Sequence, residues 1–172
     1  EYLPRGVFHS CGSLQEVYIP NKVKSIGSYA FLRCENLVNV VFSSALEEIH
    51  TSAFSGCESL IHMSSLKGVK LVENDAFKGC VKLKTVLVER VDCELDYWAF
   101  DGCLGLEFMV LPDPLPLLSI LKFPYQNEKP QRHITVCAIQ DFQTWLARMD
   151  LDKRGYDERD LAMLYQLSRR VD

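Results

Sequence analysis

Phenylalanine, cysteine and leucine recur along this chain at one constant interval of 23 residues. The recurring positions are Phe8, Phe31, Phe54, Phe77 and Phe100; Cys11, Cys34, Cys57, Cys80 and Cys103; and Leu14, Leu37, Leu60, Leu83 and Leu106. A fixed period of about 20–50 residues is typical of a solenoid, in which each unit buries its apolar face against its neighbours. We therefore expect a repeat solenoid whose most regular residues form the core, so functional residues must be sought between them.

Each repeat combines two local patterns. The stretch from Ala30 to Leu37 places apolar residues at i, i+3 steps, which suit a helical or 3₁₀ turn. The alternation of Leu37, Val40 and Phe42 then predicts a short strand with one face turned inward.

The run from Ile26 to Val40 resembles the BspA-like class of leucine-rich repeat, and the resemblance covers residues 3–111 closely. This resemblance implies a curved solenoid with a parallel β-sheet on its concave side. It also implies a binding or adhesive role rather than catalysis. The expected fold is an α/β repeat solenoid of 23-residue coils with a C-terminal helical cap.

The repeat register continues weakly beyond the regular coils. Phe123 and Ile134 keep the 23-residue interval, whereas Gln126 stands at the cysteine position. We interpret residues 112–136 as a degenerate sixth coil, interrupted by several prolines, whose final strand covers residues 133–136. The solenoid is thus expected to span residues 1–136.

Residues 137–172 show helical periodicity. Apolar residues mark one face of a first amphipathic helix and of a second over 157–170. These residues are Ile139, Phe142, Trp145, Leu146 and Met149 in the first, and Leu161, Leu164, Tyr165 and Leu167 in the second. Two such helices are expected to close the open end of the solenoid; the alternative is a docking element for a partner.

At the other end, the sequence opens part-way through a coil, with Leu3 and Phe8 in register. We expect a fragment, a processed form, or a first coil on which a partner stacks.

The seven cysteines are expected to be mostly reduced. Five of them occupy one ladder position, where parallel side chains point the same way and suit disulfide bonding poorly. An odd number cannot all pair. Reduced thiols favour an intracellular or otherwise reducing compartment.

Composition and motifs exclude several function classes. A net charge of −4 argues against nucleic acid as the main partner, and no apolar run is long enough for a transmembrane segment. The loop at 150–155 resembles a calcium loop only in part, because Leu161 stands where a bidentate glutamate is needed. No zinc motif, phosphate loop or catalytic elbow occurs, so we expect no metal, no cofactor and no catalytic residue.

The predicted partner-binding residues lie between the inward positions of the strands, where side chains must point outward. They are Tyr18, Asn39, Val41, His62, Leu87, Phe108 and Val110. One interpretation is that β-branched and aromatic residues merely suit a strand. The alternative, which we favour, is a partly apolar stripe that binds a protein.

Two functional classes remain. The first is a non-catalytic protein–protein interaction module or a subunit of a larger assembly. The second is a secreted or cell-surface adhesin that binds host or matrix proteins. The cysteine ladder favours the first.

Overall fold

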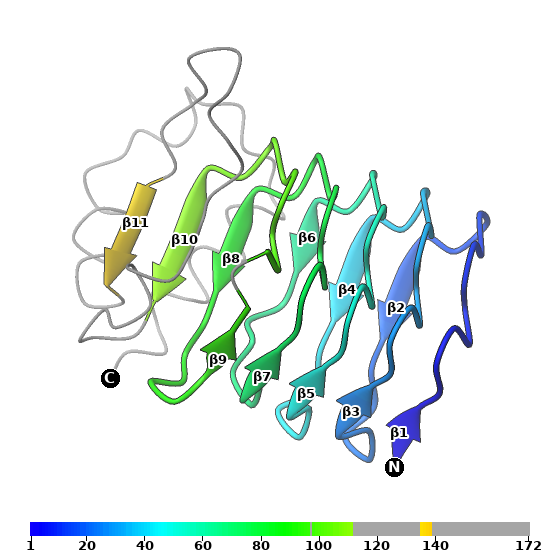
Figure 1. Cartoon of the computed structure of the whole chain (residues 1–172), viewed down its shortest axis with the longest axis horizontal. Helices are drawn as coiled ribbons and strands as arrows, with labels where there is room; N and C mark the ends of the chain where they lie inside the picture. Colours follow the sequence, from blue (N-terminus) through cyan, green and yellow to red (C-terminus); the bar gives the residue numbers. More distant parts are fainter. Residues whose placement is uncertain (97, 112–134, 139–172) are drawn as a thin grey trace.

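The protein is a parallel β-solenoid, seen in a computed structural model that describes residues 1–96 and 98–111 together with the backbone of 135–138 (Figure 1). Its strands are short because each coil changes direction after two to four residues of extended chain. The strands are β1 (Tyr2–Leu3), β2 (Glu16–Tyr18), β3 (Ser25–Ile26), β4 (Asn39–Val41), β5 (Glu48–Ile49), β6 (His62–Met63), β7 (Leu71–Val72), β8 (Thr85–Leu87), β9 (Glu94–Leu95), β10 (Phe108–Leu111) and β11 (Thr135–Ala138).

The 23-residue register is confirmed by strand pairing. Ile26 lies opposite Leu3 and Ile49 lies opposite Ile26, so these three strands stack at the 23-residue interval without a slip. The helical part of the expected α/β class is not seen. The Ala-Phe-x-x-Cys-x-x-Leu stretches form turns, and the described residues contain no helix. The expected terminal helices lie outside the described residues.

Strands lie along two sides of each coil. The expected sheet corresponds to β2, β4, β6, β8, β10 and β11, which we call the even-strand side (Figure 1). A second sheet, which the repeat pattern did not predict, is continuous and five-stranded in the order β1-β3-β5-β7-β9. Its signal in the sequence was the recurring buried apolar pair Val23 and Ile26, of which Ile26 lies in β3, but strands of two residues resemble turns in sequence.

The expected last strand is displaced along the sequence. Leu111 pairs with Ala138 rather than with Ile134, so β11 begins at Thr135 and the connection before it is four residues longer than the repeat requires. The final strand expected at residues 133–136 is thus found at Thr135–Ala138. The rest of the expected sixth coil, residues 112–134, lies outside the described part of the chain.

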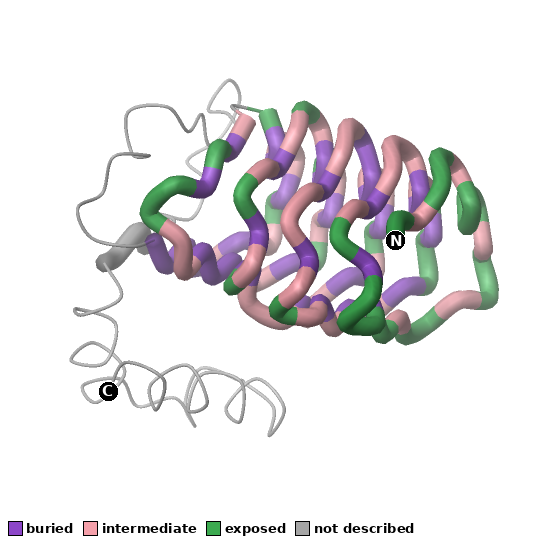
Figure 2. The backbone as a smooth tube through the Cα atoms, turned by 90° about the horizontal axis from the view of Figure 1, so that it is seen from below, coloured by how far each residue is buried: buried purple, intermediate pink, exposed green. Residues whose placement is uncertain are grey.

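The core is a set of ladders that run along the solenoid axis. Phe31, Phe54 and Phe77 are fully buried, and adjacent rings stack with centroids 4.9 and 5.2 Å apart. This spacing matches the distance between neighbouring strands, so backbone pairing and ring stacking reinforce each other. Figure 2 shows the result as buried segments that repeat at equivalent places in successive coils.

Left-handed backbone recurs at one turn of each coil. Gly56, Gly79 and Gly102 have φ near +70°, where a residue without a side chain is least strained. Arg33 adopts the same conformation with φ of 58°. The turn is thus set by stacking of the coils, and glycine is preferred but not required.

Candidate protein-binding face

Four of the predicted partner-binding residues lie together on the accessible part of the even-strand side. Tyr18 on β2 is 67% exposed and is opposite Val41 on β4, while Asn39 on β4 is opposite His62 on β6. Asn39, Val41 and His62 are each partly exposed. The parallel pairing therefore gathers the four side chains into one small surface, which we call the β2–β6 face.

The other three predicted residues are not accessible. Leu87 on β8 is 7% exposed, and Phe108 and Val110 on β10 are 3% and 0% exposed. The expectation that they are surface residues was wrong. Their inward neighbours Val86 and Met109 are also fully buried, so both faces of β8 and β10 are covered, as is typical of buried parallel sheets.

An irregularity in the third coil separates the accessible and covered halves. Coils are counted from the N-terminus. The amide of Ile19 in the first coil donates to the carbonyl of Val41, and the amide of Val88 in the fourth coil donates to the carbonyl of Val110. The period assigns the matching donor in the third coil to Ser65. Instead, Leu66 donates to the carbonyl oxygen of Leu87 at 2.9 Å.

The third coil therefore holds a one-residue bulge, and its side chains satisfy the displaced groups. Ser64 Oγ accepts a 2.7 Å hydrogen bond from the Phe42 amide, and the Ser65 hydroxyl donates to Glu89. Leu66 fills the buried position in place of Ser65. At this point the even-strand side divides into two three-stranded sheets, β2-β4-β6 and β8-β10-β11.

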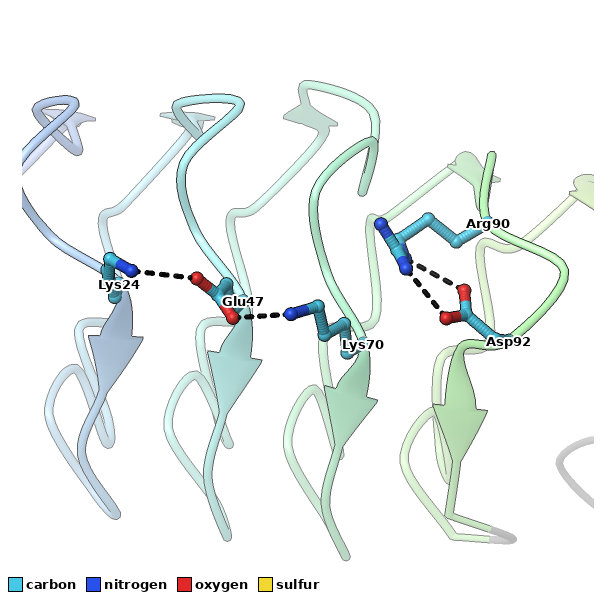
Figure 3. Close-up of polar contacts among 5 residues, drawn as sticks. All are labelled: Lys24, Glu47, Lys70, Arg90 and Asp92. Carbon is cyan, nitrogen blue, oxygen red and sulfur yellow. Dashed lines mark hydrogen bonds and ion pairs between the residues drawn. The ribbon is translucent and has the colours of Figure 1, made fainter.

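Charge pairs lie along the five-stranded sheet, next to its strands (Figure 3). Glu47 lies between Lys24 at 3.1 Å and Lys70 at 2.6 Å, and these three residues come from successive coils. Hydrogen bonds from Lys70 and Lys24 lower the pKa of Glu47. Farther along, Arg90 binds Asp92 through two hydrogen bonds, as Figure 3 also shows. Such exposed pairs contribute little to stability. Only the two pairs of Glu47 join one coil to the next, since Arg90 and Asp92 belong to the same coil.

A second polar cluster joins the coils nearby. His50 Nδ1 lies 3.0 Å from Glu73 and its Nε2 lies 3.3 Å from Glu48. Glu73 also accepts hydrogen bonds from the amide and the hydroxyl of Thr51. Partial burial alone would raise the pKa of Glu73, but the hydrogen bonds from His50 and Thr51 outweigh it and lower that pKa.

The ladder cysteines are packed as apolar groups. Cys34, Cys57, Cys80 and Cys103 are buried with free thiols, and burial raises the pKa of Cys57 to about 12. A thiol with so high a pKa is a poor nucleophile and a poor metal ligand at neutral pH. Within residues 1–96 and 98–111, no three histidine, cysteine or acidic side chains meet at a spacing suited to a metal ion. The calcium-loop-like segment at 150–155 lies outside the described residues.

In the part of the chain that the structure describes, no helix has the length and apolar character to cross a membrane.

Solved structures with a similar fold come from bacteria. A leucine-rich repeat protein of T. pallidum is 28% identical with a TM-score of 0.58, and the match covers 64% of this chain and 52% of that one. A leucine-rich cell surface protein of Faecalibacterium prausnitzii is 25% identical with a TM-score of 0.53, covering 66% and 32%. The pneumococcal vaccine antigen PcpA is 25% identical with a TM-score of 0.52, covering 56% and 24%.

The chain thus spans about half the length, or less, of these solved relatives. No curated protein matches it. Residues 1–127 match the BspA type leucine-rich repeat region, with six copies of the repeat. Because this match covers most of the chain, the protein belongs to the family of BspA-type leucine-rich repeat proteins.

Proposed function

We propose that the protein is a non-catalytic interaction module that binds a protein partner through the β2–β6 face. The observation that carries this proposal is the position of Tyr18, a large aromatic side chain that is 67% exposed on a rigid sheet. Tyrosine offers apolar area and a hydroxyl at small conformational cost, and it is enriched among residues that dominate binding energy.

The neighbouring side chains suit the same role. Val41 supplies apolar area opposite Tyr18, and Asn39 and His62 supply hydrogen-bonding groups opposite each other. Strand pairing fixes the backbone of these four residues relative to one another before any partner arrives. Binding then has a small ordering cost.

The first coil offers a second contact surface of the same kind. Tyr2 is 70% exposed and Phe8 is 37% exposed, and the Phe8 ring stacks on Phe31 with centroids 5.1 Å apart. A partner that stacks on this coil would cover Phe8 in the way that each later coil covers the ring before it.

A second candidate function is that of a secreted or cell-surface adhesin. It is favoured by the solved relatives, one of which is described as a cell surface protein and another as a vaccine antigen. The buried free thiols favour the first candidate, because secreted domains more often carry disulfides.

Affinity capture with quantitative mass spectrometry tests the β2–β6 face. The wild-type chain is compared with Tyr18→Glu and with Lys24→Glu, a charge change on the five-stranded sheet. We expect partner recovery to fall at least about tenfold for Tyr18→Glu, since a charge would be desolvated in the complex, and to stay near wild type for Lys24→Glu. Equal recovery with all three baits would exclude this face. Where the partners reside then separates the two candidates: matrix or host-surface proteins favour the adhesin.

A further inference from the structure

The covered half of the even-strand side presents one continuous outward surface. Thr85 lies opposite Phe108, and Leu87 lies opposite Val110, in the register of β8 and β10. Their exposed fractions are 5% for Thr85, 3% for Phe108, 7% for Leu87 and 0% for Val110. We call these four residues the β8–β10 face.

Lateral packing within the sheet does not explain this burial. Asn39 on β4 is also flanked on both sides by paired strands, β2 and β6, and yet remains partly exposed. Val41, which is paired with Tyr18 on β2, is also partly exposed. Val110 differs in having no exposed surface at all, so atoms must lie on top of the β8–β10 face and not only beside it.

We propose that the β8–β10 face is an intramolecular docking site for the chain's own C-terminal segment, residues 139–172. The segment starts in the right place, because β11 ends at Ala138, which is paired with Leu111 at the end of β10. Neighbouring strands are about 5 Å apart, so the end of β11 lies about 5 Å from β10 and about 10 Å from β8.

The chemistry of the segment is complementary to the face. Phe142 and Leu146 lie on the apolar side of a sequence with helical periodicity, and Leu161 and Leu164 recur on a second one. A helix with one apolar stripe must bury that stripe, and the β8–β10 face supplies Leu87, Phe108 and Val110 for it. The segment thus covers a sheet face, which is a different role from closing the end of the solenoid.

The proposed docking reduces the apolar surface that a protein partner could contact, wherever that partner binds. The apolar surface of the even-strand side is larger than the β2–β6 face, and part of it is held by the chain itself. With residues 139–172 docked, Leu87 and Val110 are not available to a partner.

Photo-crosslinking of the full chain with photo-leucine in place of leucine tests the proposal. Trypsin cuts after Lys84 and Arg90, which gives a peptide in which Leu87 is the only leucine. We expect this peptide to be crosslinked mainly to residues 139–148 or to the peptide from Asp160 to Arg169. Crosslinks mainly to the peptide from Phe123 to Arg132, or none to residues 139–172, would overturn the proposal.

Carbene footprinting of variants gives an independent measurement. The double variant Phe142→Glu and Leu146→Glu places charge on the apolar side, whereas the control Thr144→Glu places it on the opposite side. We expect labelling of Phe108 to rise at least about threefold in the double variant only. Phe54, which is fully buried in the core, should stay unlabelled in all proteins and reports that the solenoid is intact. Unchanged labelling of Phe108 with an intact solenoid would contradict the docking.

Discussion

The thiol of Cys57 donates a hydrogen bond to the carbonyl oxygen of Phe31 in the preceding coil, at 3.2 Å. The amide of Cys34 donates to the same oxygen, also at 3.2 Å. The Phe31 carbonyl therefore accepts one hydrogen bond within its own turn and one from the next coil. Cys80 repeats the thiol bond to Phe54 at 3.3 Å. The cysteine ladder is thus a column of hydrogen bonds between coils, and this explains why a small apolar residue such as alanine would not be equivalent.

Cys57→Ala is expected to lower the free energy of unfolding by about 1–2 kcal/mol, because it removes the sulfur contacts and the hydrogen bond to Phe31. Chemical denaturation measures the change. Cys11→Ala is the control, since Cys11 is only partly buried in the first coil. Equal stability of Cys57→Ala and wild type would show that the thiol bonds contribute nothing.

Leu60→Ala tests the core ladder. Leu60 is fully buried, so truncation should leave a cavity and cost about 2–5 kcal/mol. Leu104 is 57% exposed and provides a matched control, because Leu104→Ala should change stability by less than about 0.5 kcal/mol. Similar melting temperatures for the two variants would contradict the assignment of Leu60 to the core.

The sequence was sufficient for the coil register because one residue type at one position recurs without exception. Phe31 predicts the place of Phe54 whatever the local conformation, and burial of both follows from the period. Local structure within the coil was harder to derive. Two-residue strands such as β3 have no periodicity of their own, and they form because the neighbouring coil supplies the backbone partners.

The candidate site was predicted only in part for a related reason. Alternation correctly predicts which strand residues face outward, and Tyr18 and Val41 are accessible as expected. It does not indicate what else lies on that side, so Leu87 and Val110 were wrongly expected to be exposed. The bulge at Ser65 was not predicted because the 23-residue period resumes after it. The displacement of β11 was not predicted because residues 112–134 lack the cysteine and leucine that mark the register of the earlier coils.

Gly79→Ala tests the left-handed turn. Gly79 has φ of +71°, and an added Cβ would lie 3.9 Å from the Gly56 nitrogen, so space is adequate and only the backbone conformation is unfavourable. We expect a loss of about 1–2 kcal/mol, the cost of a left-handed conformation for an L-residue. Gly12→Ala is the control, because its Cβ would meet no atom within 4 Å. Thermal denaturation of the two variants gives the comparison.

The pH dependence of stability should reveal the Glu73 cluster. The pKa of Glu73 is lowered in the folded protein from its ordinary value of 4.5. A depressed carboxyl pKa stabilises the fold above the unfolded-state pKa, and this contribution is lost as pH falls through the folded-state pKa. Glu73→Gln should therefore be less stable than wild type at pH 6, and the difference should shrink steadily below about pH 4.5. A difference that is constant with pH, measured by urea denaturation, would exclude this contribution.

Leu87→Glu and Tyr18→Glu should separate the covered and accessible halves of the even-strand side. Both side chains point outward from their strands, so alternation alone would predict two harmless changes. Because Leu87 is 7% exposed, its replacement by glutamate should bury a charge and lower the free energy of unfolding by about 3 kcal/mol or more. Tyr18→Glu should change it by less than about 0.5 kcal/mol, since Tyr18 is 67% exposed. Urea denaturation of both variants provides the measurement, and a Leu87→Glu protein as stable as wild type would mean that the β8–β10 face is open to solvent.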